Sequence, residues 1–483
     1  MIFLASHLIF LMATFTLLLL DREGILVVVS VLLFAAIELS VWAIRENRTG
    51  TLNWCHPVPV FVLGYCIVYY QLPFCYLFDF ELPYYSDYVL LYPENISYCL
   101  LLASLGLSSF FCGEQVYFNK SNRIKIIKKS IIYSNYENIN KYLYRIRNVN
   151  SVIVLITFIL FFLYIRSLGL DSYFGFAYGD LTKVVGAFST HFGFAYTILL
   201  FLLILIELSR IVLLRPKSFL AYILEWDKKV LAVILITLVP FVLSGDRGSY
   251  LQPLALVIVP YFILVKPLRF KQAIFFIVVG AFVMVLVSDT RGGQSIGWQE
   301  AFYTRIDSVS NPAKWPTMEL ANSFGTFNIA TAYFPEKYSY NYGVNLFYRT
   351  ASLVPFSSFI TDIKNKNKEN DYIFSSDLFF TNILTKGTFS SGSGTSSLAD
   401  VYMDFGPYGI PVVLFVWGLV MAWISQRAVT TFSVVFVFLY AYYTYFGIYV
   451  NRSSFFYGWN SFIWVLIIYY FINRLYLLRR LSK

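Results

Sequence analysis

Charged residues are scarce in this chain of 483 residues, where Asp, Glu, Lys and Arg together make up only 13%. Hydrophobic residues make up 58%, and the mean hydropathy is +0.65. A soluble domain of this length does not need so much apolar surface, so the composition excludes an ordinary globular protein. The net charge of +10 does not indicate a nucleic-acid partner, because the basic residues cluster in short connections between apolar runs.

Histidine and cysteine are rare as well, with three and five copies in the whole chain. The cysteines lie in the first quarter of the sequence, mostly within apolar runs, which is typical of small core residues. No cluster of His, Cys and acidic side chains has the spacing of metal ligands, so we expect neither a metal nor another cofactor. Cys75 and Cys99 could flank one external loop, and a disulfide between them therefore stays an option.

The chain is instead rich in long runs of apolar residues. A hydrocarbon layer about 30 Å thick is crossed by about 20 residues of helix, and run after run reaches that length. We therefore predict an all-α polytopic membrane protein with about twelve transmembrane helices, forming a single integral membrane domain over residues 1–483. The first run lacks a basic flank and a small-residue cleavage site, so we expect it to be a retained span. The predicted spans are 1–20, 25–44, 57–79, 96–117, 151–168, 190–209, 229–243, 250–265, 272–288, 410–426, 430–450 and 460–474.

Basic residues alternate between connections and so indicate the sidedness of the spans. The connection 119–150 contains many basic residues and a single acid, Glu137, so the positive-inside rule places it in the cytoplasm. Every second connection from there is basic, and both termini fall on the cytoplasmic side. A long polar insert at residues 290–409, between the ninth and tenth spans, falls on the outer side. ATP is absent there and the chain has no Walker-type glycine loop, so any reaction needs a substrate that is already activated.

Several arginines run against the positive-inside rule because they lie on the predicted outer side. Arg247 and Arg291 are in turns that combine Asp, Arg and Gly, Arg305 follows in the insert, and Arg452 precedes the last span. A guanidinium group matches phosphate oxygens with paired hydrogen bonds, and glycine lets the backbone approach a phosphate closely. One interpretation is that these four arginines bind a lipid-linked pyrophosphate. The other is that they pair with neighbouring aspartates or with ordinary lipid headgroups.

The outer insert is rich in aromatic residues, whose faces pack against the CH groups of sugars. This favours a glycan groove that includes Trp298, Tyr303 and Tyr402, although aromatic residues are abundant throughout the chain, at 20%. Two outer side chains are candidates for a general base, His191 at the end of the sixth span and Asp400 in the insert. A lone histidine at the end of a span is also typical of a satisfied interfacial residue.

The end of the insert contains a motif that runs from Gly392 to Gly409 and leads directly into the tenth span. It resembles a segment of Wzy-type oligosaccharide repeat-unit polymerases, in which a Gly/Ser/Thr-rich loop precedes an acid, an aromatic residue and a Phe-Gly-x-x-Gly entry to a span. Arg247 and Arg291 lie where such polymerases have external arginines. The chain departs from the pattern in two ways: the acid is Asp400 where a glutamate is expected, and no Arg-x10-Gly spacing begins at either arginine.

The resemblance implies a GT-C-like membrane glycosyltransferase in the bacterial inner membrane, with its active site facing the periplasm. Such an enzyme moves a growing glycan from undecaprenyl diphosphate to the next lipid-linked repeat unit, so both donor and acceptor are undecaprenyl-diphosphate-linked oligosaccharides. On this view Arg247, Arg291, Arg305 and Arg452 bind pyrophosphate, and His191 or Asp400 deprotonates the acceptor. Membrane lipids and a regulator protein of chain length are the other partners that it implies.

Other functions fit the same architecture. An O-antigen ligase would share the diphosphate leaving group but would pass the glycan to a lipid A core. A flippase or exporter of lipid-linked oligosaccharide usually places ionisable residues in the middle of the membrane, whereas the spans here are nearly free of charge, with Glu38 the main exception. A polyprenyl-phosphate-sugar transferase would need a larger acidic first outer loop than the one at Asp21 and Glu23.

Overall fold

The computed structural model of the chain describes residues 24–82, 90–121, 136–168, 187–244, 247–289, 311–315, 317–351, 376–384, 394–455 and 458–474. Helices, joined by turns and loops, account for this part of the chain, and it contains no strand. The longer helices are α2 (Gly24–Thr49), α5 (Ile96–Ser121), α6 (Tyr136–Leu168), α9 (Ala187–Leu214), α11 (Lys228–Ser244), α12 (Arg247–Leu264), α13 (Phe270–Asp289), α20 (Ser397–Thr431), α21 (Val434–Arg452) and α22 (Trp459–Ile472).

The third predicted span is a composite of three short elements. It begins as α3 (Pro57–Cys66), widens into the π-helical turn η1 (Ile67–Gln71) and ends as α4 (Leu72–Leu77). Each predicted span from 25–44 onward therefore coincides with a helix or, here, with a run of them. Span 1–20 lies outside the described residues.

Within the described ranges, seven helices are long and apolar enough to cross a membrane. They are 24 residues at Leu26–Thr49, 21 at Pro57–Leu77, 26 at Pro93–Phe118, 26 at Leu143–Leu168, 24 at His191–Leu214, 35 at Ser397–Thr431 and 19 at Val434–Arg452. Shorter apolar helices include Gly248–Leu264 and Trp459–Ile472. The prediction of an all-α polytopic membrane protein is confirmed at this level, while the number of spans, the position of the termini and a GT-C-like fold stay predictions.

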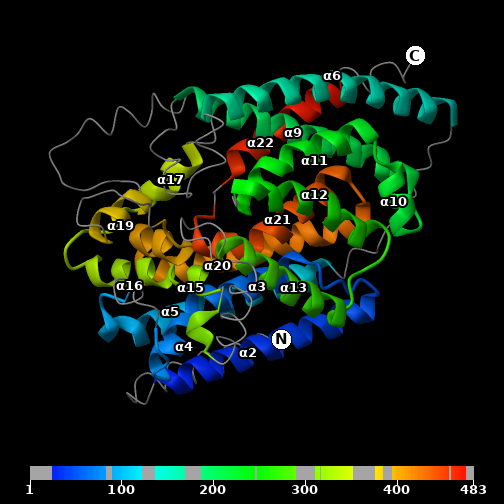
Figure 1. Cartoon of the computed structure of the whole chain (residues 1–483). Helices are drawn as coiled ribbons and strands as arrows, with labels where there is room; N and C mark the ends of the chain where they lie inside the picture. The colour runs from blue at the N-terminus through cyan, green and yellow to red at the C-terminus, as the bar shows by residue number, and fades with distance from the viewer. Residues whose placement is uncertain are drawn as a thin grey trace.

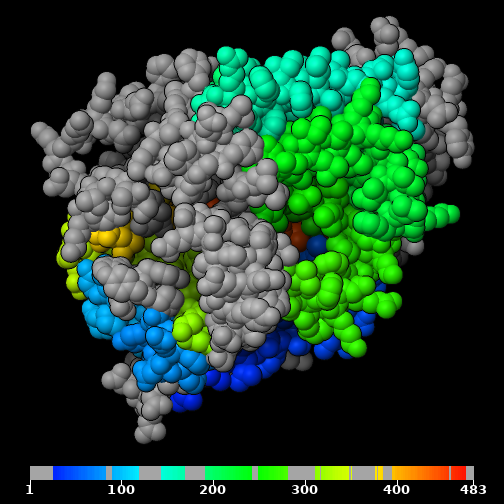
Figure 2. Space-filling view, viewed as in Figure 1, coloured from blue at the N-terminus to red at the C-terminus, as the bar shows by residue number. Residues whose placement is uncertain are grey.

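The helices form a bundle whose two edges are α6 and α2 (Figures 1 and 2). Between these edges α6 packs on α9, α9 on α22 and α21, α21 on α3 and α20, and α20 on α5, which in turn contacts α2. Both edge helices expose apolar side chains: Ile37 of α2 is 61% exposed and Leu155 of α6 is also 61% exposed. Such faces are suited to contact with lipid tails.

Contacts between connections agree with the alternation of sides that the charges predict. Asn53, in a predicted inner connection, accepts a hydrogen bond from Leu268 N–H at 3.0 Å, and Leu268 is in another predicted inner connection. At the opposite end, Lys314 of the insert lies 3.1 Å from Glu81, in a predicted outer loop. We call the end at which α20 begins and α21 ends the outer end, following the charge prediction.

Part of the polar insert is folded into this outer end. It contains η4 (Pro312–Lys314), α15 (Met318–Ala321), α16 (Phe324–Tyr333), α17 (Val344–Ala351) and α19 (Ser376–Leu384), which lie together at one end of the bundle (Figure 1). Helix α16 is buried along most of its length and packs on α20 and α5. In addition α20 begins at Ser397, well before the span predicted at 410–426. The insert is therefore partly a helical cap on the bundle and not only a loop.

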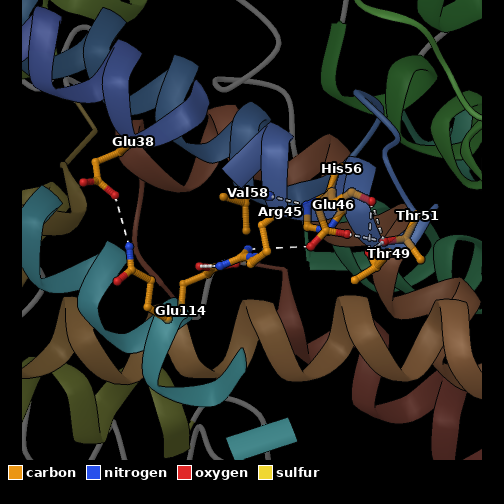
Figure 3. Close-up of polar contacts among 9 residues, drawn as sticks. Glu38, Arg45, Glu46, Thr49, Thr51, His56, Val58 and Glu114 are labelled. Carbon is orange, nitrogen blue, oxygen red and sulfur yellow. Dashed lines mark hydrogen bonds and ion pairs between the residues drawn. The ribbon is translucent and has the colours of Figure 1, made fainter. Parts of the chain in front are cut away.

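The helices contain more buried acids than Glu38, which the sequence indicates as the main exception. Besides Glu38, which is 3% exposed, Glu114 of α5 is 2% exposed and Glu207 of α9 is fully buried. Arg45 Nη1 donates to Glu114 Oε2 at 2.8 Å, and its guanidinium also contacts Glu46 and Glu114 Oε1 (Figure 3). The carboxylate of Glu114 is thus paired with the guanidinium of Arg45.

Glu207 has a comparable set of partners at the inner end. It accepts hydrogen bonds from Arg210 Nε at 2.8 Å, from Asn150 Nδ2 at 2.8 Å and from the Asp227 N–H at 2.9 Å. These contacts join α9 to α6 and to the start of α11, so this carboxylate has a structural role. Cys75 and Cys99 are both free, buried thiols, and no disulfide joins them.

Candidate functional site

The motif that ends the insert forms the outer segment of α20. Ser396 is the N-cap of this helix, and its side chain accepts a hydrogen bond from Ala399 N–H at 3.4 Å. The helix is broken at Gly406, whose φ of 65° and ψ of −160° are almost exclusive to glycine. A Cβ at this position would also lie 2.8 Å from the Tyr340 ring. The motif therefore makes a short buried helix before the kink and a membrane-length helix after it.

A single tyrosine hydroxyl holds the start of α20 in place. Tyr69, in the π-helical turn η1, donates to the carbonyl of Asn451 at 3.0 Å and accepts from Leu398 N–H at 3.1 Å. Its hydroxyl also lies 3.0 Å from Ser397 Oγ. Three membrane helices thus converge on one atom, and the wider π-helical turn is a geometry that recurs at functional sites.

The two carboxylates of this segment, Asp400 and Asp404, lie one helical turn apart and line the same pocket. Thr395 Oγ1 donates to Asp400 Oδ1 at 2.6 Å. Asp404 accepts from Asn345 N–H at 3.0 Å and from Leu346 N–H at 2.8 Å, so it caps the first turn of α17. The pocket contains about 310 Å³ of empty space, part of it open to solvent, and is lined by Asn345, Leu346, Asp400, Val401, Asp404, Phe405, Val413, Ser454 and Phe455.

Arg452 is the predicted pyrophosphate ligand whose side chain the structure describes. It is the last residue of α21, two positions before Ser454 of the pocket, and a cation there interacts favourably with the helix dipole. Its Nη1 lies 3.6 Å from Glu319 Oε1, and the two side chains are 35% and 49% exposed. Such an exposed ion pair is weak. An anionic ligand could therefore compete with Glu319 for the guanidinium.

The side chains of the other three predicted arginines lie outside the described part of the structure. Arg247 begins α12 at the outer end, but its side chain lies outside the described part of the structure, as do Arg291 and Arg305 as a whole. Trp298 and Tyr303, predicted to contact glycan, also fall outside it.

His191 and Tyr402 are described but lie apart from the pocket lining. His191 is exposed near the start of α9. Tyr402 is 2% exposed, its hydroxyl donates to the Phe334 carbonyl at 3.3 Å, and its ring packs at 6.2 Å from that of Phe327. Direct contact between Tyr402 and a glycan would require this ring to be uncovered.

Three residues of the site, Asp404, Tyr69 and Asn345, are not among those predicted from the sequence. Asp404 could have been found, because its spacing of four from Asp400 places both carboxylates on one helical face. Tyr69 and Asn345 had no such signal, since each reaches the motif from a distant part of the chain. Within the described residues, no three His, Cys, Asp or Glu side chains gather as they would around a metal ion.

The described residues form an all-helical bundle that contains membrane-length helices. At its outer end lie a helical cap and a pocket with two carboxylates, next to an arginine. These features define a polytopic membrane protein with a site at one end. The family described as O-antigen polysaccharide polymerase Wzy has a sequence model that matches residues 1–480. The chain belongs to this family, which confirms the resemblance of its Gly392–Gly409 motif and makes it a membrane enzyme that polymerises polysaccharide. Comparison with curated proteins and with solved structures gives no match.

Proposed function

We propose that this chain joins undecaprenyl-diphosphate-linked oligosaccharide repeat units into O-antigen or a related surface polysaccharide at the periplasmic face of the bacterial inner membrane. The observation that carries the proposal is the match of the polymerase family over residues 1–480. The position of Asp400 and Arg452 at the same end of the bundle supports it, because the reaction needs a proton acceptor and a cation at one place.

The proposed reaction is a glycosyl transfer between two lipid-linked glycans. An acceptor hydroxyl at the non-reducing end of one repeat unit attacks the anomeric carbon of the donor glycan. A new C–O glycosidic bond forms, the bond from that carbon to the diphosphate oxygen breaks, and undecaprenyl diphosphate leaves with the bonding electrons. Asp400 takes the proton of the hydroxyl, with Thr395 fixing the orientation of its carboxylate. His191 is the second candidate for this base.

The leaving diphosphate needs positive charge that is available in the transition state. Arg452 is suited to this because its partner Glu319 holds it only in a half-exposed pair. Arg247, Arg291 and Arg305 are proposed to supply further guanidinium groups, and the chain itself is proposed to act without a metal or another cofactor. A charged hydrogen bond of this type contributes about 1.5 to 3 kcal/mol.

Contacts with the sugars would come from the aromatic residues of the insert. Trp298, Tyr303 and Tyr402 are the proposed glycan-binding residues, and the exposed rings of Tyr342 and Tyr408, at 82% and 84%, add aromatic surface at the outer end. A regulator protein of chain length is the proposed protein partner, alongside the surrounding lipids.

The test is a reconstitution of the purified full-length chain with one synthetic undecaprenyl-diphosphate-linked repeat unit, with the products resolved on a gel. We expect a ladder of products that differ by one repeat unit. Arg452→Gln should raise the KM for the lipid-linked repeat unit about tenfold or more, from the loss of a charged hydrogen bond. Glu319→Gln is the matched control, because it frees the same guanidinium and should not raise that KM.

The outcomes separate the polymerase from its rivals. A single transfer to an added lipid A core without a ladder would indicate a ligase, and translocation across a vesicle membrane without any new glycosidic bond would indicate a flippase. An authentic repeat unit that yields no ladder with folded enzyme would contradict the proposal. A ladder of unchanged rate from an Arg247→Glu variant would remove the role assigned to Arg247.

A further inference from the structure

Tyr342 is held in a backbone conformation that a large side chain rarely adopts. It is the first central residue of a turn at 341–344, in which Val344 N–H donates to the Asn341 carbonyl at 3.1 Å. The φ angles of Tyr342 and Gly343 are 51° and 86°, as in a type I′ turn, where Asn, Asp and Gly are the usual residues. A bulky residue with a positive φ is strained, and such strain is concentrated at functional sites. The turn itself therefore does not account for a tyrosine at this position.

Packing within the protein does not account for the tyrosine either, because the ring of Tyr342 is 82% exposed. The connection that leads to the turn is polar: its exposed side chains, at residues 335–337 and 339, are Pro, Glu, Lys and Ser. Such a surface is suited to water and not to a hydrocarbon layer, which excludes lipid tails as the partner of the ring. A ligand in the water phase is the explanation that is left.

Two contacts fix the turn against the outer segment of α20. Asn341 N–H donates to the Met403 carbonyl at 2.9 Å. The ring of Tyr340 lies over Gly406, where a Cβ would be 2.8 Å from its Cζ. Tyr342 follows directly after these two anchored residues, so its backbone is held against the segment that forms the carboxylate pocket. A group that is already held in place loses little conformational entropy when a ligand binds.

Phe405 connects the turn with the pocket. Its ring belongs to the pocket lining and is 39% exposed. Gly343 lies directly against the edge of this ring, since a Cβ there would be 3.1 Å from Cζ and 3.3 Å from Cε1. The exposed ring of Tyr342, one residue before Gly343, is therefore beside the pocket that Asp400 and Asp404 also line.

A sugar ring matches this combination of aromatic rings and carboxylates. Its CH groups pack on aromatic faces, and its hydroxyls donate hydrogen bonds to carboxylate oxygens. A diphosphate would be repelled by the two carboxylates, and an apolar chain would gain nothing from them. The chemistry of the pocket thus favours the glycan part of a lipid-linked substrate over its carrier part.

We propose that Tyr342 and Phe405 form a sugar-binding subsite, in which one sugar ring of the repeat unit packs on the face of Tyr342 beside the carboxylate pocket. The inference rests on the proposed function. Tyr342 contributes its aromatic face, so it favours sugars that present a continuous CH surface, and its hydroxyl is not required. The strain in the turn is retained because asparagine, which suits the turn, has no aromatic face.

The test compares Tyr342→Asn with Tyr342→Phe in the full-length enzyme. Asparagine suits the turn but removes the ring, whereas phenylalanine keeps both the ring and the strain. Phe432→Asn is the control, because Phe432 also has a positive φ, of 49°, but is the C-cap at the inner end of α20.

Three quantities are measured for each protein. The first is the KM for the lipid-linked repeat unit in the ladder assay. The second is the Kd of the free repeat-unit oligosaccharide, without a carrier, from saturation-transfer NMR. The third is the thermal unfolding midpoint in detergent.

We expect Tyr342→Asn to raise the KM and the Kd about three- to tenfold, as the loss of an aromatic contact predicts. Its unfolding midpoint should rise, because asparagine relieves the strain in the turn. Weaker binding by a more stable protein excludes misfolding as the cause. Tyr342→Phe and Phe432→Asn should both keep the KM and the Kd of the unchanged enzyme.

The results distinguish this inference from the function on which it rests. If the unchanged enzyme makes no ladder, the proposed function is wrong, and the Kd of the free oligosaccharide alone decides on the subsite. If the ladder forms and Tyr342→Asn leaves both KM and Kd unchanged, the function stands and the subsite is overturned. Equal losses in Tyr342→Asn and Tyr342→Phe would also overturn it, because the aromatic face would then not be what binds the sugar.

Discussion

Gly113 of α5 and Gly418 of α20 lie on facing sides of the same helix crossing, each directly against a backbone carbonyl of the other helix. A Cβ on Gly113 would be 2.0 Å from the Phe415 carbonyl oxygen, and a Cβ on Gly418 would be 2.1 Å from that of Phe110. Small residues let membrane helices approach closely and gain packing contacts that lipid cannot provide. This crossing sets the position of α20, the helix that carries Asp400 and Asp404.

Gly418→Ala should therefore destabilise the bundle. The added methyl group must push α20 away from α5, at a cost of about 1–3 kcal/mol, as for other overpacked cores. The thermal unfolding midpoint in detergent measures this. Gly280→Ala is the control, since a Cβ at Gly280 meets no atom within 4 Å, and it should leave the midpoint unchanged or slightly raised. Equal midpoints for the two variants would argue against close packing at the crossing.

Gly406→Ala should reduce polymerisation more than it reduces stability. The substitution meets both a positive φ and the Tyr340 ring, so the strain of about 1–3 kcal/mol is relieved by moving the segment that carries Asp400. Gly50→Ala is a matched control, because Gly50 has a φ of 71° but open space around it and lies at the inner end. Comparable losses of polymerase activity in both variants would show that the kink has no special role in the site.

The ion pair between Arg45 and Glu114 should be required for folding although it adds little net stability. Arg45→Met leaves the carboxylate of Glu114, 2% exposed, without its cation, and should cost about 3–5 kcal/mol. The double variant Arg45→Met with Glu114→Gln removes both charges and should recover most of that loss. A double-mutant cycle of unfolding free energies measures the coupling. Additive effects of the two substitutions would contradict a direct interaction.

His56 should make stability depend on pH in the weakly acidic range. It caps α3 by accepting from Val58 N–H at 3.1 Å, and burial, followed by the charge of Arg45, lowers the pKa of its imidazole from 6.5 to about 3. Between these values the unfolded chain binds a proton that the folded chain does not. Stability from this group is therefore complete above pH 6.5 and falls as the pH decreases.

The substitution His56→Asn tests this, because asparagine is also a good N-cap but does not titrate. Relative to this variant, the unchanged protein should lose about 1.4 kcal/mol per pH unit below the unfolded pKa. Unfolding in detergent between pH 7.5 and 5 gives the comparison. A constant offset between the two proteins across this range would show that folding does not lower the pKa of His56.

The helices could be predicted from the sequence because each one depends on the apolar residues within its own run. A run such as 190–209 has to be a buried helix whatever surrounds it, since apolar side chains and paired backbone groups are what a membrane requires. The start of α20 was less predictable. Ser396 is a good N-cap residue in the sequence, yet it lies within a run of Gly, Ser and Thr at residues 390–397, which is typical of a loop.

The site was predictable only where its residues share one motif. Asp400 follows from the motif, but its neighbour Asn345 comes from a different helix of the insert, and no spacing relates the two. The same limit explains Glu114, which looks like an isolated acid within an apolar run. Its partner Arg45 is 69 residues away, so only the packing of α2 against α5 shows that the charge is balanced.

The cap that Asp404 places on α17 has a consequence for engineering chimeric polymerases. The N–H groups of Asn345 and Leu346 both donate to Asp404, and these bonds join residues 344–346 to residues 396–406. Neither stretch therefore keeps its geometry if the other is replaced. Exchanging the outer insert between relatives to change sugar preference would succeed only when the two stretches are transplanted together. The natural point of ligation is then Gly406, where the backbone already changes direction.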